Sequence, residues 1–219
     1  MVVALLLSGC GGEAAPPAAK PTSSIEAPRP PAGPEKLVVA FGDSLYAGYG
    51  LKPGEAWPAR LEKALWARGI NAHVVNAGVS GDTTAAGRQR LGFILDSQPR
   101  APELVIVGLG GNDMLRGLPP AQARANLEAI LAELDRRKIP AMLTGMLAAP
   151  NMGEAYAREF NAIYPALAQR HDAALVPFFM AAVVGDPRLF QPDHVHPTAA
   201  GVDRIVAATV DEVAGALKR

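Results

Sequence analysis

Short apolar runs alternate with helical patterns along most of the chain after residue 36. Runs rich in Val, Leu and Ile predict five strands, at residues 37–41, 73–76, 104–109, 141–145 and 174–176. Apolar residues recur at helical spacing in three segments, namely Trp57, Leu61 and Leu65; Leu127, Ile130, Leu131 and Leu134; and Val202, Ile205, Val206, Val210, Val213 and Leu217. Strands that alternate with helices indicate parallel strands joined by right-handed crossovers. The pattern therefore predicts a three-layer α/β/α domain.

Composition limits the chain to one domain and excludes some classes of partner. A chain of 219 residues that is 49% hydrophobic can bury one sizeable core, and we assign residues 36–219 to a single domain. The 21 basic and 21 acidic residues cancel, and no Lys/Arg run stands out, which argues against a nucleic-acid partner. An aromatic content of 5% gives no support for a base-stacking surface.

The N-terminal residues 1–10 resemble a signal remnant that ends in a bacterial lipobox. An apolar run, residues 2–7, leads into Leu7-Ser8-Gly9-Cys10, and Cys10 would be the lipidated residue. We therefore expect an exported lipoprotein, anchored in a membrane through Cys10 and facing the periplasm or the cell exterior. The run lacks preceding basic residues and is shorter than a usual apolar core of roughly 7 to 15 residues, so the alternative is an apolar leader with an incidental cysteine.

Cysteine usage and the next segment add two expectations. Cys10 is the only cysteine, which excludes an intramolecular disulfide and a thiol nucleophile in the domain. Residues 11–35 are rich in Ala and Pro and hold Ile25 as their only large aliphatic residue. Such a segment buries too little apolar surface to offset its ordering entropy, so we expect a disordered or polyproline-like tether.

Two fragments far apart in the sequence offer the groups that acyl transfer requires. Gly42-Asp43-Ser44-Leu45 follows the first predicted strand, and Asp193-His194-Val195-His196-Pro197 precedes the last predicted helix. Serine is a weak nucleophile at neutral pH, so an imidazole must accept its proton and a carboxylate must orient that imidazole. The two fragments together supply all three groups.

Two further polar blocks follow the second and third predicted strands. They are Asn76-Ala77-Gly78-Val79-Ser80-Gly81-Asp82-Thr83 and Gly110-Gly111-Asn112-Asp113. In an open parallel sheet the binding crevice forms at the carboxyl ends of the strands. We therefore expect these loops to converge with Ser44 on one edge of the sheet.

Taken in order, the four blocks closely resemble those of the SGNH (GDSL-type) serine hydrolases. The resemblance covers residues 36–218 and is nearest to the bacterial secreted group of thioesterase I, lysophospholipase and arylesterase. It implies a flavodoxin-like, five-stranded parallel sheet and an enzyme that needs no metal or organic cofactor.

The resemblance also implies a role for particular residues. It places the nucleophile on Ser44 and the Asp-x-x-His pair on Asp193 and His196. The oxyanion hole would consist of the backbone N–H groups of Ser44 and Gly81 and the side-chain amide of Asn112.

Several of these residues have structural alternatives. Ser44 could cap the following segment, and Asn112 could be an ordinary turn residue after two glycines. We expect Asp43 and Asp113 to be acceptors that steady loops. Asp82 and Thr83 are expected to begin the next helix as caps.

His194 raises the question of a metal site. Asp193, His194 and His196 could serve as ligands, but a zinc site needs a further ligand or an open water position, so we expect none. By resemblance, relatives carry glycine at the position of His194, and we expect a solvated residue at the rim of the site.

The expected function is hydrolysis of carboxylic esters or thioesters, such as aryl esters, acyl thioesters or lysophospholipids. By resemblance, residues 114–119 and 147–153 line an acyl groove, with Met114, Leu115, Leu118, Pro150 and Met152 as substrate-binding residues. One alternative is a carbohydrate or cell-wall O-acetyl esterase of the same superfamily. Another is a non-catalytic flavodoxin-like binding domain. Neither the natural ester nor the oligomeric state is specified by the sequence.

Overall fold

The computed structural model describes residues 1–2 and 29–218. The predicted lipidation residue Cys10 and residues 11–28 of the predicted tether lie outside the described residues. Within the described part of the chain, no helix combines the length and hydrophobicity that a bilayer-spanning segment needs.

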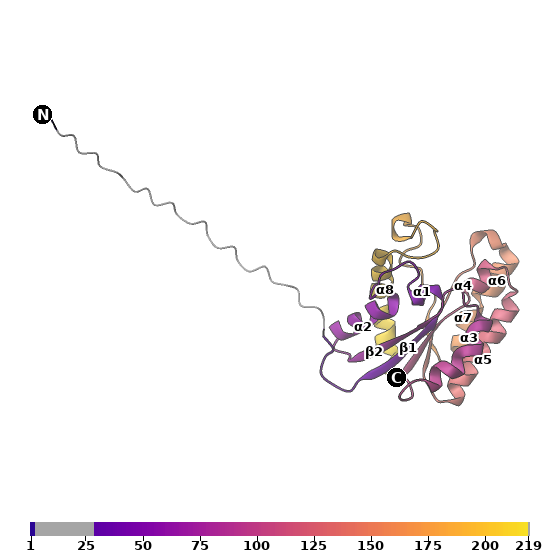
Figure 1. The fold of residues 1–219 in the computed structure, drawn as a ribbon. Helices are drawn as coiled ribbons and strands as arrows, with labels where there is room; N and C mark the ends of the chain where they lie inside the picture. The colour runs from indigo at the N-terminus through magenta and orange to yellow at the C-terminus, as the bar shows by residue number, and fades with distance from the viewer. Residues whose placement is uncertain (3–28, 219) are drawn as a thin grey trace.

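Five parallel strands form the sheet at the centre of the domain (Figure 1). They are β1 (Lys36–Gly42), β2 (Ala72–Gly78), β3 (Leu104–Gly108), β4 (Ala141–Thr144) and β5 (Ala174–Val176). Their order is β2-β1-β3-β4-β5, the order of a flavodoxin-like sheet. The five predicted strands and the predicted fold class are confirmed, with strand ends that differ by one or two residues.

The helices form a layer on each side of the sheet. They are α1 (Ser44–Ala47), α2 (Trp57–Ala67), α3 (Thr84–Asp96), α4 (Gly111–Leu115), α5 (Pro120–Arg136), α6 (Glu154–Asn161), α7 (Ile163–Arg170) and α8 (Ala199–Ala216), with 3-10 turns η1 (Pro150–Met152) and η2 (Pro187–Leu189). Helices α2 and α8 cover one face, and α3, α5, α6 and α7 cover the other (Figure 1). The three predicted helices are confirmed as α2, α5 and α8.

Alternate residues of the central strands supply the two halves of the core. Val38 and Ala40 of β1 pack toward α2 and α8, whereas Val39 and Phe41 pack toward α3, α5 and α7. Because both faces are covered, the central strands β1 and β3 are almost entirely apolar rather than alternating, as is usual for parallel sheets, whereas the edge strand β2 alternates.

The ends of three strands bring their following loops to one edge. Gly42 at the end of β1 pairs in register with Gly78 of β2 and with Gly108 of β3. Strand β1 lies between β2 and β3, so successive strands are added on opposite sides of it. Such a switch point in strand order leaves a crevice outside the carboxyl ends of the strands.

Gly78 allows the end of β2 to approach the segment that carries Ser44. A Cβ at Gly78 would lie 2.8 Å from the carbonyl carbon of Tyr46 and 2.9 Å from the carbonyl oxygen of Asp43. Because these are backbone atoms, a side chain at this position would push the two segments apart.

Candidate active site

The loops after β1, β2 and β3 meet the loop before α8 at the carboxyl edge of the sheet. This arrangement brings Ser44, Asp193 and His196 into one chain of hydrogen bonds. Ser44 and His196 are 152 residues apart in the sequence. Only the tertiary fold joins them.

Ser44 is the first residue of the short helix α1, directly after β1. Asp43 caps this helix, and its Oδ1 accepts a hydrogen bond from the backbone N–H of Leu45. The helix ends at Gly48, whose φ of 81° lies in the left-handed region that favours glycine. This tight turn presents the Ser44 hydroxyl at the edge of the sheet, 2.8 Å from Nε2 of His196.

Asp193 holds the imidazole of His196 from the other side. Its Oδ2 lies 2.7 Å from Nδ1 of His196, and its Oδ1 accepts the backbone N–H groups of Val195 and His196, each at 3.0 Å. The backbone N–H of His196, the imidazole and the N–H of Val195 together lower the pKa of Asp193 to about 2. An ionised carboxylate accepts the Nδ1 proton, which leaves Nε2 to accept a proton from Ser44.

Two residues that the sequence analysis missed hold the loop of His196 in place. The ring of Tyr49 packs against the His196 imidazole, with centroids 4.5 Å apart. The Gln191 side-chain amide donates to the carbonyls of Tyr49 (2.7 Å) and Pro197 (3.0 Å). Gln191 and Tyr49 are 142 residues apart, so no local pattern in the sequence could have indicated this contact.

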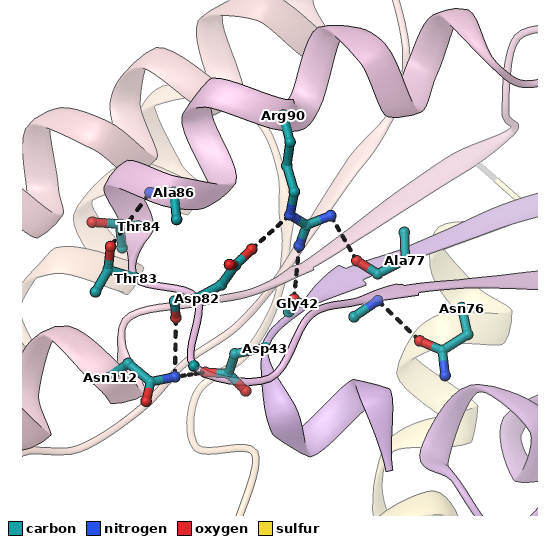
Figure 2. Close-up of polar contacts among 12 residues, drawn as sticks. Gly42, Asp43, Asn76, Ala77, Asp82, Thr83, Thr84, Ala86, Arg90 and Asn112 are labelled. Carbon is teal, nitrogen blue, oxygen red and sulfur yellow. Dashed lines mark hydrogen bonds and ion pairs between the residues drawn. The ribbon is translucent and has the colours of Figure 1, made fainter. Parts of the chain in front are cut away.

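Three groups with N–H donors lie beside Ser44. The backbone N–H groups of Ser44 and Gly81 donate to no acceptor within the described part of the chain. The Asn112 amide nitrogen donates to the carbonyl of Asp82 at 3.0 Å and to Oδ2 of Asp43 at 3.3 Å (Figure 2). Gly81 has a φ of 86°, which explains why glycine occupies this position.

Two buried carboxyl groups steady the loops, as the sequence predicted. Asp113 is 1% exposed and accepts hydrogen bonds from the backbone N–H and the hydroxyl of Thr84 at the start of α3. Asp43 is 3% exposed. The pKa of Asp43 is raised from its ordinary value of 3.8 to about 6, chiefly by burial and to a smaller extent by the nearby charges of Asp82 and Asp113. The Leu45 N–H and His196 oppose this rise.

The prediction that Asp82 caps the next helix is wrong. Thr83 alone is the N-cap of α3 and accepts from the N–H of Ala86. The Asp82 carboxylate instead pairs with Arg90, at 2.6 Å between Oδ2 and Nε (Figure 2). The Arg90 guanidinium, nearly two helical turns into α3, competes more strongly for this carboxylate than the backbone does.

His194 lies at the rim of the site. It adopts a φ of 58°, in the left-handed region that favours glycine and is uncommon for other residues. This conformation gives a physical reason for the glycine that we expect in relatives at this position. Among the described residues, no group of three or more His, Cys, Asp and Glu side chains has the arrangement of a metal site.

A cavity of about 680 Å³ opens beside Ser44 and His196. Most of its lining is apolar, and Met114, Leu115, Leu147 and Pro150 of the predicted groove segments contribute to it, together with Met146, Phe178, Met180, Val184, Phe190 and Val195.

The other two predicted groove residues, Leu118 and Met152, do not line this cavity. Met152 packs against the core beneath α5 and α7. Leu118 lies in the turn before α5, where its carbonyl accepts a hydrogen bond from Tyr156.

Comparison with known proteins places this geometry in a family. Residues 40–204 match the GDSL-like lipase/acylhydrolase family. The chain is 38% identical over 171 residues to esterase TesA of Pseudomonas aeruginosa, covering 78% of this chain and 84% of that protein. It is 39% identical over 160 residues to thioesterase 1/protease 1/lysophospholipase L1 of Escherichia coli K12, covering 73% of this chain and 74% of that protein.

A solved structure shares both the fold and much of the sequence. AlinE4, described as an SGNH-hydrolase family esterase, is 63% identical with a TM-score of 0.73, covering 84% of this chain and 98% of AlinE4. The predicted family is therefore confirmed. The chain belongs to the GDSL-like lipase/acylhydrolase family, and it is an esterase of the SGNH-hydrolase type.

Proposed function

We propose that the protein hydrolyses carboxylic esters and thioesters through Ser44, His196 and Asp193 and a covalent acyl-enzyme. The observation that carries the proposal is the continuous hydrogen-bonded path from the Ser44 hydroxyl through both nitrogens of His196 to Asp193. This is the arrangement that activates a serine as a nucleophile.

In the first half of the reaction, Nε2 of His196 accepts the hydroxyl proton of Ser44 as Oγ attacks the acyl carbonyl. Asp193 stabilises the resulting imidazolium through Nδ1. The tetrahedral intermediate collapses, the bond to the leaving alcohol or thiol breaks, and His196 returns the proton to it. Water then attacks the acyl-enzyme by the same route and releases the acid.

The negative charge that develops on the acyl oxygen is stabilised by Ser44 N–H, Gly81 N–H and the Asn112 amide. The two backbone donors have no acceptor within the described residues, so an oxyanion would satisfy them without breaking an existing bond. The Asn112 amide already donates to the Asp82 carbonyl at 3.0 Å and to Oδ2 of Asp43 at 3.3 Å, so it would give up the longer bond, to Asp43, when it donates to the oxyanion.

Asp43 influences this donor through its ionisation. In its charged form it accepts the hydrogen bond from Asn112. Because its pKa is raised to about 6, the group is a mixture of both forms in mildly acidic solution and is ionised above neutrality.

The acyl group binds in the apolar cavity, against Met114, Leu115 and Pro150. A cavity of about 680 Å³ is much larger than an acetyl group requires, which favours longer acyl chains over the O-acetyl esterase alternative. The names of the relatives, an esterase and a thioesterase/lysophospholipase, agree with carboxylic esters, acyl thioesters and lysophospholipids as substrates.

The enzyme is exported and anchored in a membrane through lipidated Cys10, with residues 11–35 as the tether. The lipobox-like Leu7-Ser8-Gly9-Cys10 supports this part of the proposal. Two acyl chains suffice for stable anchoring where one is marginal. We expect Cys10→Ala to release the protein from membranes in its native host, and mass spectra that show an unmodified Cys10 there would contradict the anchor.

Replacing Ser44 or His196 by alanine should abolish nearly all hydrolysis. We expect each single variant to lower kcat by roughly 10⁴- to 10⁶-fold and the double variant to be little worse, because the two residues act as a unit. A fluorophosphonate probe should label the wild type and Ser97→Ala, a control at the end of α3, but not Ser44→Ala. Full additivity of the two losses, or labelling of Ser44→Ala, would contradict the proposed mechanism.

The chain-length profile tests the acyl site. Each methylene buried in the cavity contributes up to about 0.8 kcal/mol, so kcat/KM for p-nitrophenyl esters should climb from acetate to medium chains and then level off. Leu115→Ser should reduce the octanoate-to-acetate ratio of kcat/KM, whereas Leu118→Ser, outside the cavity, should leave that ratio unchanged. A profile that peaks at acetate would favour the O-acetyl esterase alternative.

Titration of Asp43 should be visible in the pH dependence of stability. Because the pKa of Asp43 is higher in the folded state than in the unfolded state, the contribution of Asp43 to stability is greatest below pH 3.8. This contribution is lost as the pH rises to about 6. Relative to Asp43→Asn, which does not titrate, the unfolding free energy of the wild type should fall by roughly 3 kcal/mol across this window. Urea denaturation of both proteins from pH 3.5 to 7 measures the difference, and a constant difference would contradict the raised pKa.

A further inference from the structure

Arg90 makes three hydrogen bonds at the edge of the sheet, and all go to segments of the candidate active site. From α3, its Nε donates to Oδ2 of Asp82 at 2.6 Å, its Nη1 to the carbonyl of Ala77 at 2.8 Å, and its Nη2 to the carbonyl of Gly42 at 2.8 Å. Figure 2 shows the guanidinium between these acceptors. Its side chain is only 18% exposed.

Each acceptor leads directly to one of the proposed oxyanion donors. Gly42 is two residues before Ser44, and Ala77 opens the segment that continues to Gly81. Asp82 holds the Asn112 amide through its backbone carbonyl, at 3.0 Å (Figure 2). The Arg90 guanidinium therefore binds all three segments that position the oxyanion donors, namely those carrying the Ser44 N–H, the Gly81 N–H and the carbonyl that holds the Asn112 side chain.

The shape of the group matters as much as its charge. A guanidinium presents donors in a rigid planar fork, whereas a lysine ammonium is a compact point charge on a flexible stem. The guanidinium carbon also lies 4.1 Å from the centre of the Phe41 ring, which fixes the plane of the fork over a buried residue. A lysine could neutralise Asp82 here but could not reach both strand-end carbonyls in the same way.

We propose that Arg90 is a positioning residue that sets the spacing of the three oxyanion donors. It is not among the residues that line the cavity, so it acts through Gly42, Ala77 and Asp82 rather than by contact with the substrate. The inference rests on the proposed function of Ser44, Gly81 and Asn112 and adds to it the residue that holds them in register.

Kinetics of Arg90→Ala and Arg90→Lys on p-nitrophenyl butyrate test the proposal. Because misplacement by about 1 Å costs up to about 10²-fold in rate, we expect kcat to fall roughly 10- to 100-fold in both variants. KM should stay within about threefold, since donors aimed at the transition state contribute little to ground-state binding. Arg88→Ala, two residues earlier on α3 with an exposed guanidinium, is the matched control and should keep the wild-type kcat.

Two further measurements separate positioning from a general structural role. Free guanidinium at millimolar concentration should partly restore kcat of Arg90→Ala, while the same concentration of methylammonium should not. In the Asn112→Ala background, Arg90→Ala should cost less than it does in the wild type, because both changes affect the same oxyanion hole. If Arg90→Ala does not fold, Arg90→Lys, compared in the wild-type and Asn112→Ala backgrounds, provides the test.

Wild-type kcat in Arg90→Lys, or an equal cost of the Arg90 change with and without Asn112, would overturn the inference. These outcomes are distinct from failure of the proposed function. An active Ser44→Ala enzyme would refute the proposed mechanism whatever Arg90 does. An inactive Ser44→Ala enzyme beside fully active Arg90 variants would refute the positioning role alone.

Discussion

The parallel pairing of β1 with β2 on one side and β3 on the other is the constraint on which the site depends. Because Gly42, Gly78 and Gly108 stand in register, the three following loops leave the sheet at the same level. Ser44, Gly81 and Asn112 each lie within four residues of one of these strand ends. A slip of one strand would move its loop along the edge and would also turn its apolar side chains to the opposite face.

Three carboxyl groups, those of Asp43, Asp82 and Asp113, lie next to the site, and each has a different kind of partner. Asp113 is held by the N-terminal residue of α3, and Asp82 is paired with Arg90. Asp43 has only neutral donors, Leu45 N–H and the Asn112 amide, and its pKa is raised accordingly. Burying a charge without a counterion is costly, so its retention beside Ser44 is consistent with a role in holding Asn112 rather than in stabilising the fold.

The imidazole depends on a different part of the molecule. His196 reaches Ser44 because residues 191–197 fold back before α8, held by Gln191 and by the Asp193 carboxylate. Helix α8 packs on α2 and on the sheet, so the same core that buries its apolar face also fixes the position of this loop. The packing of α8 therefore also determines where the His196 imidazole lies relative to Ser44.

The sequence by itself determined where the five strands lie and which polar loops follow them, and it supplied the Ser, His and Asp residues that we propose as catalytic. Strands buried on both faces are continuous apolar runs, and helices α2, α5 and α8 repeat their apolar residues every three or four positions, so both are visible in local patterns. Only the tertiary structure decided that Asp82 pairs with Arg90, that Tyr49 and Gln191 support His196, and that Leu118 and Met152 do not line the cavity. These depend on contacts between residues distant in sequence or on the direction of a side chain in a loop, and neither leaves a periodic signal in the chain.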